Sequence, residues 1–437
     1  MTTVLFILKA LLQGRLSALE WLGRSSPRGG RLRIGTRRAI LLSTPDLVEE
    51  ILVQRTDEFR KGPALRIYSR PLLGNGILTS EGETHRKHRR LVAPAFAHQR
   101  VSRYADVMSA LARETCASWP NGGTISMHRE MTRLTLAIVG RTLFDADLLQ
   151  DADAIGARIT DLIRYATDQT RSFRPVPLEK DTPKNRRAVE SVEKLNQTMY
   201  GMIEQRRASG EDKGDLLSML LLARDEDGSS LSDEQVRDEA MTLFVAGHET
   251  TANATTWALY LLARHPEIQN QLQQQVREAV GMRPIAFGDL PKIPLALQVF
   301  KESMRLYPPA YIVVREPLED LQVGGGIKVR QGELIALCEW VIQRNPLYFP
   351  DPLRFDPSRF SPENESSIPR YSYFPFGGGR RICIGNQFAL MEGQIILSTV
   401  AQHAALENVS RRSVQADPLM TLRPVGPAPI RVSHLRP

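Results

Sequence analysis

Cysteine is scarce in this sequence, and its N-terminal apolar run is short. Only Cys116, Cys338 and Cys383 occur among 437 residues, too few for the disulfide framework of a secreted protein, which favours a reducing cytoplasm. The run from Val4 to Leu12 is interrupted by Lys9 and falls short of the roughly 20 residues that a spanning helix needs. No small-residue cleavage site follows it at the distance typical of a secretory signal. We therefore expect a short amphipathic surface helix there, with no membrane span, in a cytoplasmic protein.

Flexible linkers are also missing. No Gly/Ser-rich or Pro-rich stretch divides the chain, so a single large domain is compatible with a length that would otherwise suggest two or three. Lys and Arg number 57 against 49 Asp and Glu, a net charge of +8, which permits acidic partners without identifying one. DNA binding would require a basic motif, and none stands out, so we expect no nucleic-acid partner.

The hydrophobic spacing predicts a mainly α-helical fold with a small β region. Apolar residues recur at helical spacing from Val101 to Arg264, and Ser232 with Gln235 forms a capping box for a helix about 50 Å long that ends before His265-Pro266. Further helices are predicted over 295–307 and 387–403. Short strands are predicted at 311–315, 321–323, 327–329 and 334–337, followed by a long ordered loop over 345–379.

The sharpest local sequence runs from Phe376 to Gly385 and brings three glycines and two arginines just before Cys383. Glycines let the backbone approach a planar cofactor, while the following helix and the arginines would favour thiolate over thiol. A lone cysteine is more often a small buried hydrophobe, but that alternative explains neither the glycines nor the arginines. Because no second ligand stands at zinc spacing, a single thiolate indicates haem iron.

This segment, Phe-x-x-Gly-x-Arg-x-Cys-x-Gly, resembles the haem-binding signature of the cytochrome P-450 superfamily at every fixed position. The resemblance extends from about Leu32 to the C-terminus, which implies an N-terminal segment over 1–31 and a catalytic domain over 32–437. It implies haem b held between the long central helix and the cysteine loop, with Cys383 as the axial iron ligand. The other residues that it places against haem are Phe376, Gly377, Ala246, Ile384 and Gly385.

The middle of the long helix reads Ala246-Gly-His-Glu249-Thr250-Thr251, where glycine and β-branched residues replace better helix formers. A glycine kink for packing would explain the stretch if it stood alone. It resembles the family's oxygen-activation groove, in which a threonine and the neighbouring acid relay protons to dioxygen. The resemblance therefore implies catalytic roles for Thr250 and Glu249.

Two further groups of charged residues are implied by the same resemblance. His85, Arg89, Arg315 and Arg381 match positions that bind the haem propionates. Glu302 and Arg305 stand three apart on one helix face, a spacing that alone indicates only a surface ion pair. The family joins their equivalents to that of Arg359 in a buried structural triad.

The resemblance implies a monooxygenase that inserts one atom of O2 into an apolar substrate of terpenoid, fatty-acid or steroid size. The expected pocket residues are Leu65, Ile67, Leu72, Ile77, Thr242, Val245, Ala246, Ala310, Tyr311 and Val313. The resemblance includes no fused reductase, so it implies that electrons come from a ferredoxin or flavodoxin with its reductase, docked on Arg86, Lys87, Arg90 and Arg380. Rival interpretations are a peroxide-driven hydroxylase, against which the Glu249-Thr250 pair argues, a non-enzymatic haem gas sensor, and a basic nucleic-acid-binding protein.

Overall fold

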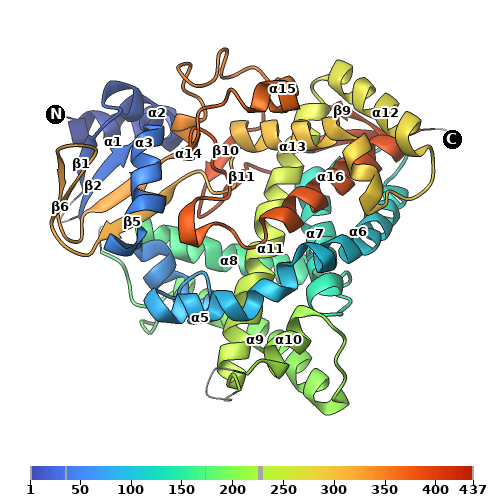
Figure 1. Ribbon diagram of the computed structural model, residues 1–437, viewed down its shortest axis with the longest axis horizontal. Coiled ribbons are helices and arrows are strands. Elements are labelled where there is room, and N and C mark those ends of the chain that lie inside the picture. Colours follow the sequence, from blue (N-terminus) through green and yellow to red (C-terminus); the bar gives the residue numbers. More distant parts are fainter. Residues whose placement is uncertain (1, 35–36, 173, 225–229, 436–437) are drawn as a thin grey trace.

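The computed structural model describes residues 2–34, 37–172, 174–224 and 230–435. Helices dominate this part of the chain, and the largest sheet lies at the end that holds the N-terminus (Figure 1). The helices are α1 (Thr2–Gln13), α2 (Arg15–Ser25), α3 (Pro45–Glu49), α4 (Arg70–Leu73), α5 (Gly82–Val92), α6 (His98–Ser118), α7 (Met127–Leu143), α8 (Ala152–Arg171), α9 (Pro183–Ser209), α10 (Leu216–Leu222), α11 (Asp233–Leu262), α12 (Pro266–Val280), α13 (Pro294–Leu306), α14 (Glu339–Ile342), α15 (Pro362–Glu365) and α16 (Asn386–His403). The strands are β1 (Gly30–Ile34), β2 (Arg37–Leu42), β3 (Phe59–Lys61), β4 (Thr124–Ser126), β5 (Val313–Pro317), β6 (Leu321–Val323), β7 (Ile327–Val329), β8 (Leu334–Leu337), β9 (Ala404–Asn408), β10 (Ala416–Pro418), β11 (Leu422–Pro424) and β12 (Pro429–His434).

The largest sheet has the strand order β1-β2-β8-β5-β3. Strands β2 and β8 pair in parallel, with Leu42 opposite Leu337, and the other neighbours are antiparallel. Leu42, Leu47 and Leu337 are buried together, so one face of the sheet packs against α3. This packing fixes β5, whose first residues enter the candidate site described below.

Helix α11 crosses the centre of the helical part of the molecule (Figure 1). Its N-terminus carries the predicted capping box, in which the Ser232 hydroxyl accepts from the Gln235 amide while the Gln235 side chain accepts from the Ser232 amide. Helices α7, α13 and α16 pack around it. From Val236 to Ala263 every residue is buried except Ala246, Gly247 and Thr250. These three residues therefore mark the one stretch of α11 that opens onto a cavity.

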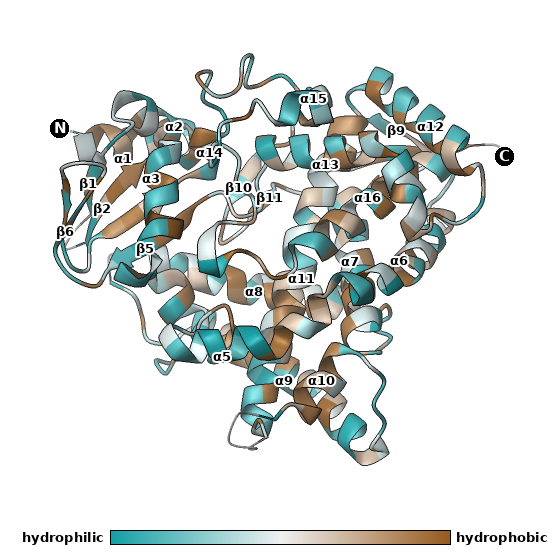
Figure 2. Cartoon of the chain, viewed as in Figure 1, coloured by the Kyte–Doolittle hydropathy of each residue, from teal (hydrophilic) through white to brown (hydrophobic). Residues whose placement is uncertain are grey.

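The fold class expected from the sequence is confirmed, and so is the position of the long helix. Strands β5 to β8 lie close to the predicted segments, whereas β1 to β4 and β9 to β12 were not predicted. These additional strands are three to six residues long and pair with distant segments, so their sequences carry little local signal. Figure 2 shows hydrophobic residues in the large sheet and a largely hydrophilic α5. Among the described residues, no helix is long and apolar enough to cross a membrane.

Candidate active site

A cavity of about 580 Å³ lies between α11, α8, β5 and the loop that carries Cys383. Most of its wall is apolar. The sequence-predicted pocket residues that line it are Leu65, Leu72, Ile77, Thr242, Val245, Ala246, Ala310, Tyr311 and Val313. Sequence reasoning missed one wall, formed by α8 through Leu162, Ile163 and Ala166. The apolar stripe of that amphipathic helix was the available signal.

Ile67, also expected in the pocket, does not line this cavity. Residues Ala64–Tyr68 form a single π-helical turn, in which Leu65 and Tyr68 face the cavity while Ile67 points outward and is 47% exposed. A π-helical turn changes the direction in which successive side chains point, and these five residues do not reveal such a turn in the sequence.

The loop that carries Cys383 is held by backbone hydrogen bonds and by its glycines. The Cys383 amide donates to the Phe376 carbonyl at 2.9 Å, and the Gly377 amide donates to that of Phe374 at 2.8 Å. Gly379 has a φ of +63°, and a Cβ there would lie 2.0 Å from the carbonyl oxygen of Leu52. A side chain at this position would therefore displace the loop, whereas Gly377, at φ +72°, has nothing within 4 Å of a built Cβ. Phe376, Gly377, Cys383, Ile384 and Gly385 all line the cavity.

The expectation that the loop arginines favour a Cys383 thiolate is wrong for the protein alone. Cys383 is exposed to the cavity, but the protein around its sulfur still desolvates it and raises the pKa of the thiol, and the Gly385 amide and the Arg89 guanidinium oppose this effect without overcoming it. Arg381 instead pairs with Glu81, and Arg380 with Asp57 at 2.7 Å. A bound metal cation would therefore have to supply the stabilisation of the thiolate.

The residues predicted to bind propionates converge on one end of the cavity. His85, Arg89, Arg315 and Arg381 all line it. Arg89 donates to the Ile382 carbonyl at 2.8 Å, which ties α5 to the cysteine loop. Burial and then the charge of Lys61 lower the pKa of His85 to about 3, so its imidazole is neutral at pH 7 and offers one N–H donor.

Lys61 belongs to the same cationic group, and sequence reasoning missed it. Its ammonium donates to the carbonyls of Ser80 at 2.8 Å and Ile77 at 3.1 Å, and burial and then Arg381 lower its pKa to about 7. Burial and Arg381 likewise lower the pKa of Arg315 to about 10. Among the described residues, no carboxylate forms an ion pair with Lys61 or Arg315. Buried cations without carboxylate partners fit a cofactor that brings its own carboxylates, as haem does.

Thr250 lies where α11 opens onto the cavity. Its hydroxyl donates to the Ala246 carbonyl at 2.8 Å, the i−4 bond that a threonine forms within a helix. The lone pairs of this hydroxyl remain available to a molecule in the cavity. Thr250, next to Ala246, therefore places a polar hydroxyl group in a mostly apolar wall of the cavity.

Glu249 is buried beside Thr250 in a network that sequence reasoning did not find. Arg423 donates to both carboxylate oxygens at 2.6 Å, Thr421 donates at 2.7 Å and Asn253 at 2.8 Å. Burial opposes ionisation of this carboxyl, but Arg423 and its hydrogen bonds lower the pKa of Glu249 below the ordinary value. Glu249 is therefore a carboxylate held by a cation from the β10–β11 hairpin.

The three residues of the predicted structural triad lie together beside the segment that runs from Asp351 to Asp356. Arg305 donates to the two oxygens of Glu302 at 2.7 Å, and both side chains are fully buried. The Arg359 Nε lies 3.5 Å from Glu302, whose carboxylate also accepts the Asp356 amide at 2.9 Å. None of the three lines the cavity. Their position is consistent with support of that segment.

The cations expected to meet an electron donor lie partly beside acids. Arg86 pairs with Glu83 and lies 3.6 Å from Asp57, and Asp57 also pairs with Arg380. Asp57 therefore joins α5 to the cysteine loop on one exposed surface. Lys87 and Arg90 follow Arg86 on α5.

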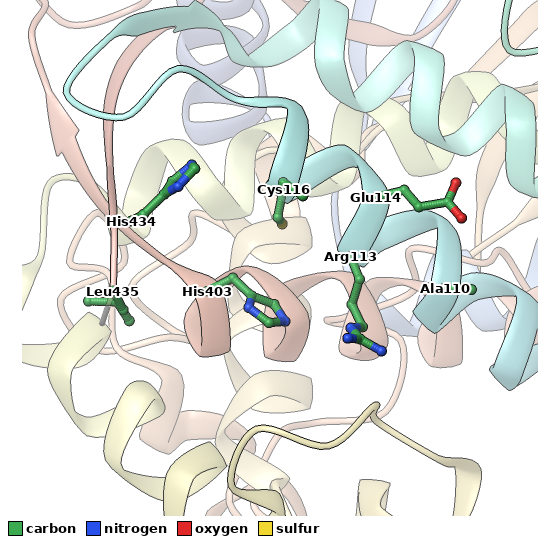
Figure 3. A pocket seen from close by; sticks show the side chains of 8 residues that line it. Ala110, Arg113, Glu114, Cys116, His403, His434 and Leu435 are labelled. Carbon is green, nitrogen blue, oxygen red and sulfur yellow. The ribbon is translucent and has the colours of Figure 1, made fainter. Parts of the chain in front are cut away.

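A second pocket, of about 490 Å³, lies between the C-terminal halves of α6 and α16 and the end of β12. Figure 3 shows Cys116, His403 and His434 around it. Within the part of the chain that the structure describes, no group of three or more His, Cys, Asp or Glu residues is arranged to hold a metal ion. This pocket therefore gives no alternative metal centre.

Comparison with known proteins gives matches across nearly the whole chain. The family model for cytochrome P450 matches residues 16–428. The chain is 35% identical to cyclooctatin synthase from Streptomyces melanosporofaciens over 422 residues, covering 94% of this chain and 90% of that protein. It is 31% identical to pentalenene oxygenase from Streptomyces avermitilis over 401 residues, covering 92% and 87%. The crystal structure of the cytochrome P450DA haem domain superposes with a TM-score of 0.87 at 28% identity, covering 97% of this chain and 93% of that one.

Proposed function

Because the chain belongs to the cytochrome P450 family and is a haem-dependent monooxygenase, we propose that it oxidises a largely apolar molecule of terpenoid, fatty-acid or steroid size. The observation that carries this proposal is the apolar cavity that reaches both Cys383 and Thr250. The names of the relatives favour the terpenoid class, since one is an oxygenase of pentalenene and another of cyclooctat-9-en-7-ol.

We propose haem b as the cofactor and Cys383 as its axial ligand. When bound, haem supplies the iron chemistry that activates O2. The chain's own contribution is the sulfur at one end of a rigid glycine loop and the cationic group formed by Lys61, Arg315 and Arg381. These cations would hold the two propionates, and the neutral His85 would donate a hydrogen bond to one of them.

Thr250 and Glu249 are proposed to govern proton delivery. The Thr250 hydroxyl lies at the opening of α11 and can order a water molecule between the cavity and the helix. The Glu249 carboxylate is the proton acceptor nearest to it in the sequence, and Arg423, Thr421 and Asn253 fix its orientation. Proton transfer through Glu249 would therefore require the ion pair with Arg423 to loosen.

Electrons are proposed to come from a separate ferredoxin or flavodoxin with its reductase, in the cytoplasm. Arg380 belongs to the loop that carries Cys383, and Arg86, Lys87 and Arg90 belong to α5, which Arg89 ties to that loop. These cations would attract an acidic donor. Complementary charges mainly accelerate the encounter and are screened beyond about 8–10 Å at physiological salt.

Two optical experiments test the proposed function. The reduced carbon monoxide adduct of the purified holoprotein should show the absorption band diagnostic of thiolate ligation, and Cys383→Ser should lose it. A panel of terpenes, fatty acids and steroids should then include compounds that shift the haem from low to high spin. If only charged, sugar-like compounds produced the shift, the substrate class would be wrong. A Cys383→Ser protein that kept the thiolate band would refute the ligand assignment.

A further inference from the structure

Helix α1 turns its apolar side outward. Val4, Leu5, Ile7, Leu8, Leu11 and Leu12 are all exposed, and Leu12 is 81% exposed. At 100° per residue these six side chains cover one continuous face of the helix. The opposite face holds Phe6 and Ala10, which are half-buried, and Phe6 packs on the cluster around Leu22 and Trp340. In a typical surface helix the apolar face packs on the protein core, whereas in α1 most of the apolar face is turned to the outside.

The segment around α1 also holds most of the net charge of the protein. Residues 1–42 contain eight lysines and arginines and one acid, Glu20, a net charge of +7 in a chain whose total is +8. Helix α1 contacts α2 and β1, and the Arg33 amide donates to the Thr3 hydroxyl at 3.1 Å. Lys9 lies on α1, and Arg15, Arg24 and Arg38 are exposed on α2 and β2. Glu333, Asp46 and Glu20 pair with Arg31, Arg28 and Arg24, and the remaining cations leave the segment basic.

We propose that α1 and the basic segment beside it bind the surface of an anionic lipid bilayer. An exposed apolar face next to cations is the pattern of a helix that lies in the bilayer interface, with its side chains among the acyl chains and its cations at the headgroups. The twelve residues of α1 span about 18 Å, well short of the roughly 30 Å hydrocarbon core, so the helix lies on the membrane and does not cross it.

Two observations favour a bilayer over a second copy of the chain. A symmetric contact through α1 would bring two basic segments together, and like charges across an interface are unfavourable. In addition, the main cavity extends to Arg15, the first residue of α2, and to Tyr68 and Arg171. A bilayer bound at α1 would therefore lie beside one end of the cavity, where an apolar substrate could pass from lipid to protein.

Vesicle flotation of the holoenzyme tests this proposal independently of the haem chemistry. The protein should float with vesicles of phosphatidylglycerol and phosphatidylcholine and bind phosphatidylcholine alone at least about tenfold more weakly. Leu8→Asp should weaken binding about tenfold or more, because it places a charge in the apolar face. Met282→Asp is the matched control: Met282 is 45% exposed against 48% for Leu8, and follows α12 at the opposite end of the molecule (Figure 1). It should bind as the parent does.

A charge variant and a measurement without lipid complete the experiment. Arg24→Gln with Arg38→Gln should weaken binding to the anionic vesicles about tenfold while leaving binding to phosphatidylcholine unchanged. Circular dichroism and the carbon monoxide spectrum check that each variant is folded and loaded. The proposal is overturned if the parent does not float, or if Leu8→Asp and Met282→Asp bind equally. It is also overturned if sedimentation without lipid shows self-association that Leu8→Asp abolishes.

Discussion

Replacing Arg423 by methionine should destabilise the protein by about 3–5 kcal/mol at neutral pH. The guanidinium forms two hydrogen bonds of 2.6 Å to Glu249 and a third of 2.8 Å to Thr160, and the two charged side chains are 8% and 7% exposed. Methionine fills similar volume but leaves a buried carboxylate with only Thr421 and Asn253 as donors. Removing one partner of a buried ion pair typically costs this amount because the remaining charge is uncompensated.

The loss should depend on pH in a defined direction. In the parent, Arg423 lowers the folded-state pKa of Glu249, so the carboxylate stabilises the fold above the ordinary pKa of 4.5 and this contribution fades as the pH falls through the lowered value. Without Arg423, burial dominates and the folded-state pKa rises above the unfolded one. The buried carboxylate then destabilises the fold at neutral pH, and protonation relieves this as the pH falls. The difference between parent and variant should therefore be largest near pH 7 and narrow toward pH 5.

Urea unfolding followed by tryptophan fluorescence measures the effect, with Glu249→Gln and the double variant completing a cycle. Glu249→Gln introduces a neutral amide, so no buried charge is left without a partner when Arg423 is replaced. Arg423→Met should therefore lower the free energy of unfolding much less in that background. The coupling of NADPH consumption to product should also acquire a pH dependence between 5 and 8 in Arg423→Met that the parent lacks, because Glu249 now titrates nearer that range. A loss below about 1 kcal/mol, or an equal loss in the Glu249→Gln background, would refute the reasoning.

The features that could be predicted from the sequence are encoded within a few consecutive residues. The cysteine loop from Phe376 to Gly385 is encoded locally, because Gly377 and Gly379 adopt the positive φ angles that its turns require. The start of α11 is likewise local, since Ser232 and Gln235 complete each other's hydrogen bonds. Such features need no knowledge of the tertiary contacts.

Most of the errors and omissions depend on contacts between distant segments. Arg423 reaches Glu249 from the far end of the chain, and nothing near either residue in the sequence indicates that pairing. Lys61 joins the cationic end of the cavity because β3 pairs with β5 and places it opposite Arg315. Desolvation by the surrounding protein, which no sequence window reports, raises the pKa of the Cys383 thiol. The cysteine loop could therefore be predicted from the sequence, whereas the electrostatics that surround it could not.

Four further measurements test the remaining assignments. Thr250→Ala should still bind substrate and consume NADPH but lose much of its product to peroxide, and coupling equal to the parent's would place the relay elsewhere. Val245→Phe, at the cavity wall of α11, should change the position at which the substrate is oxidised, as measured by product analysis. Unchanged products would contradict the assignment of this cavity as the substrate pocket. Lys61→Met should weaken haem retention about tenfold in competition with apomyoglobin, because it removes a charge-assisted hydrogen bond to a carboxylate; retention equal to the parent's would exclude that contact. Arg86→Glu should slow reduction by an acidic ferredoxin or flavodoxin about tenfold at low salt, since the new carboxylate would stand beside Asp57 and Glu83, and the parent's rate should itself fall as salt is added. Arg141→Glu is its control, because Arg141 is similarly exposed and paired with Asp147 but lies on α7. If both variants slowed reduction equally, or if the reduction rate did not change with salt, the proposal that the donor docks on the surface around Arg86 would be refuted.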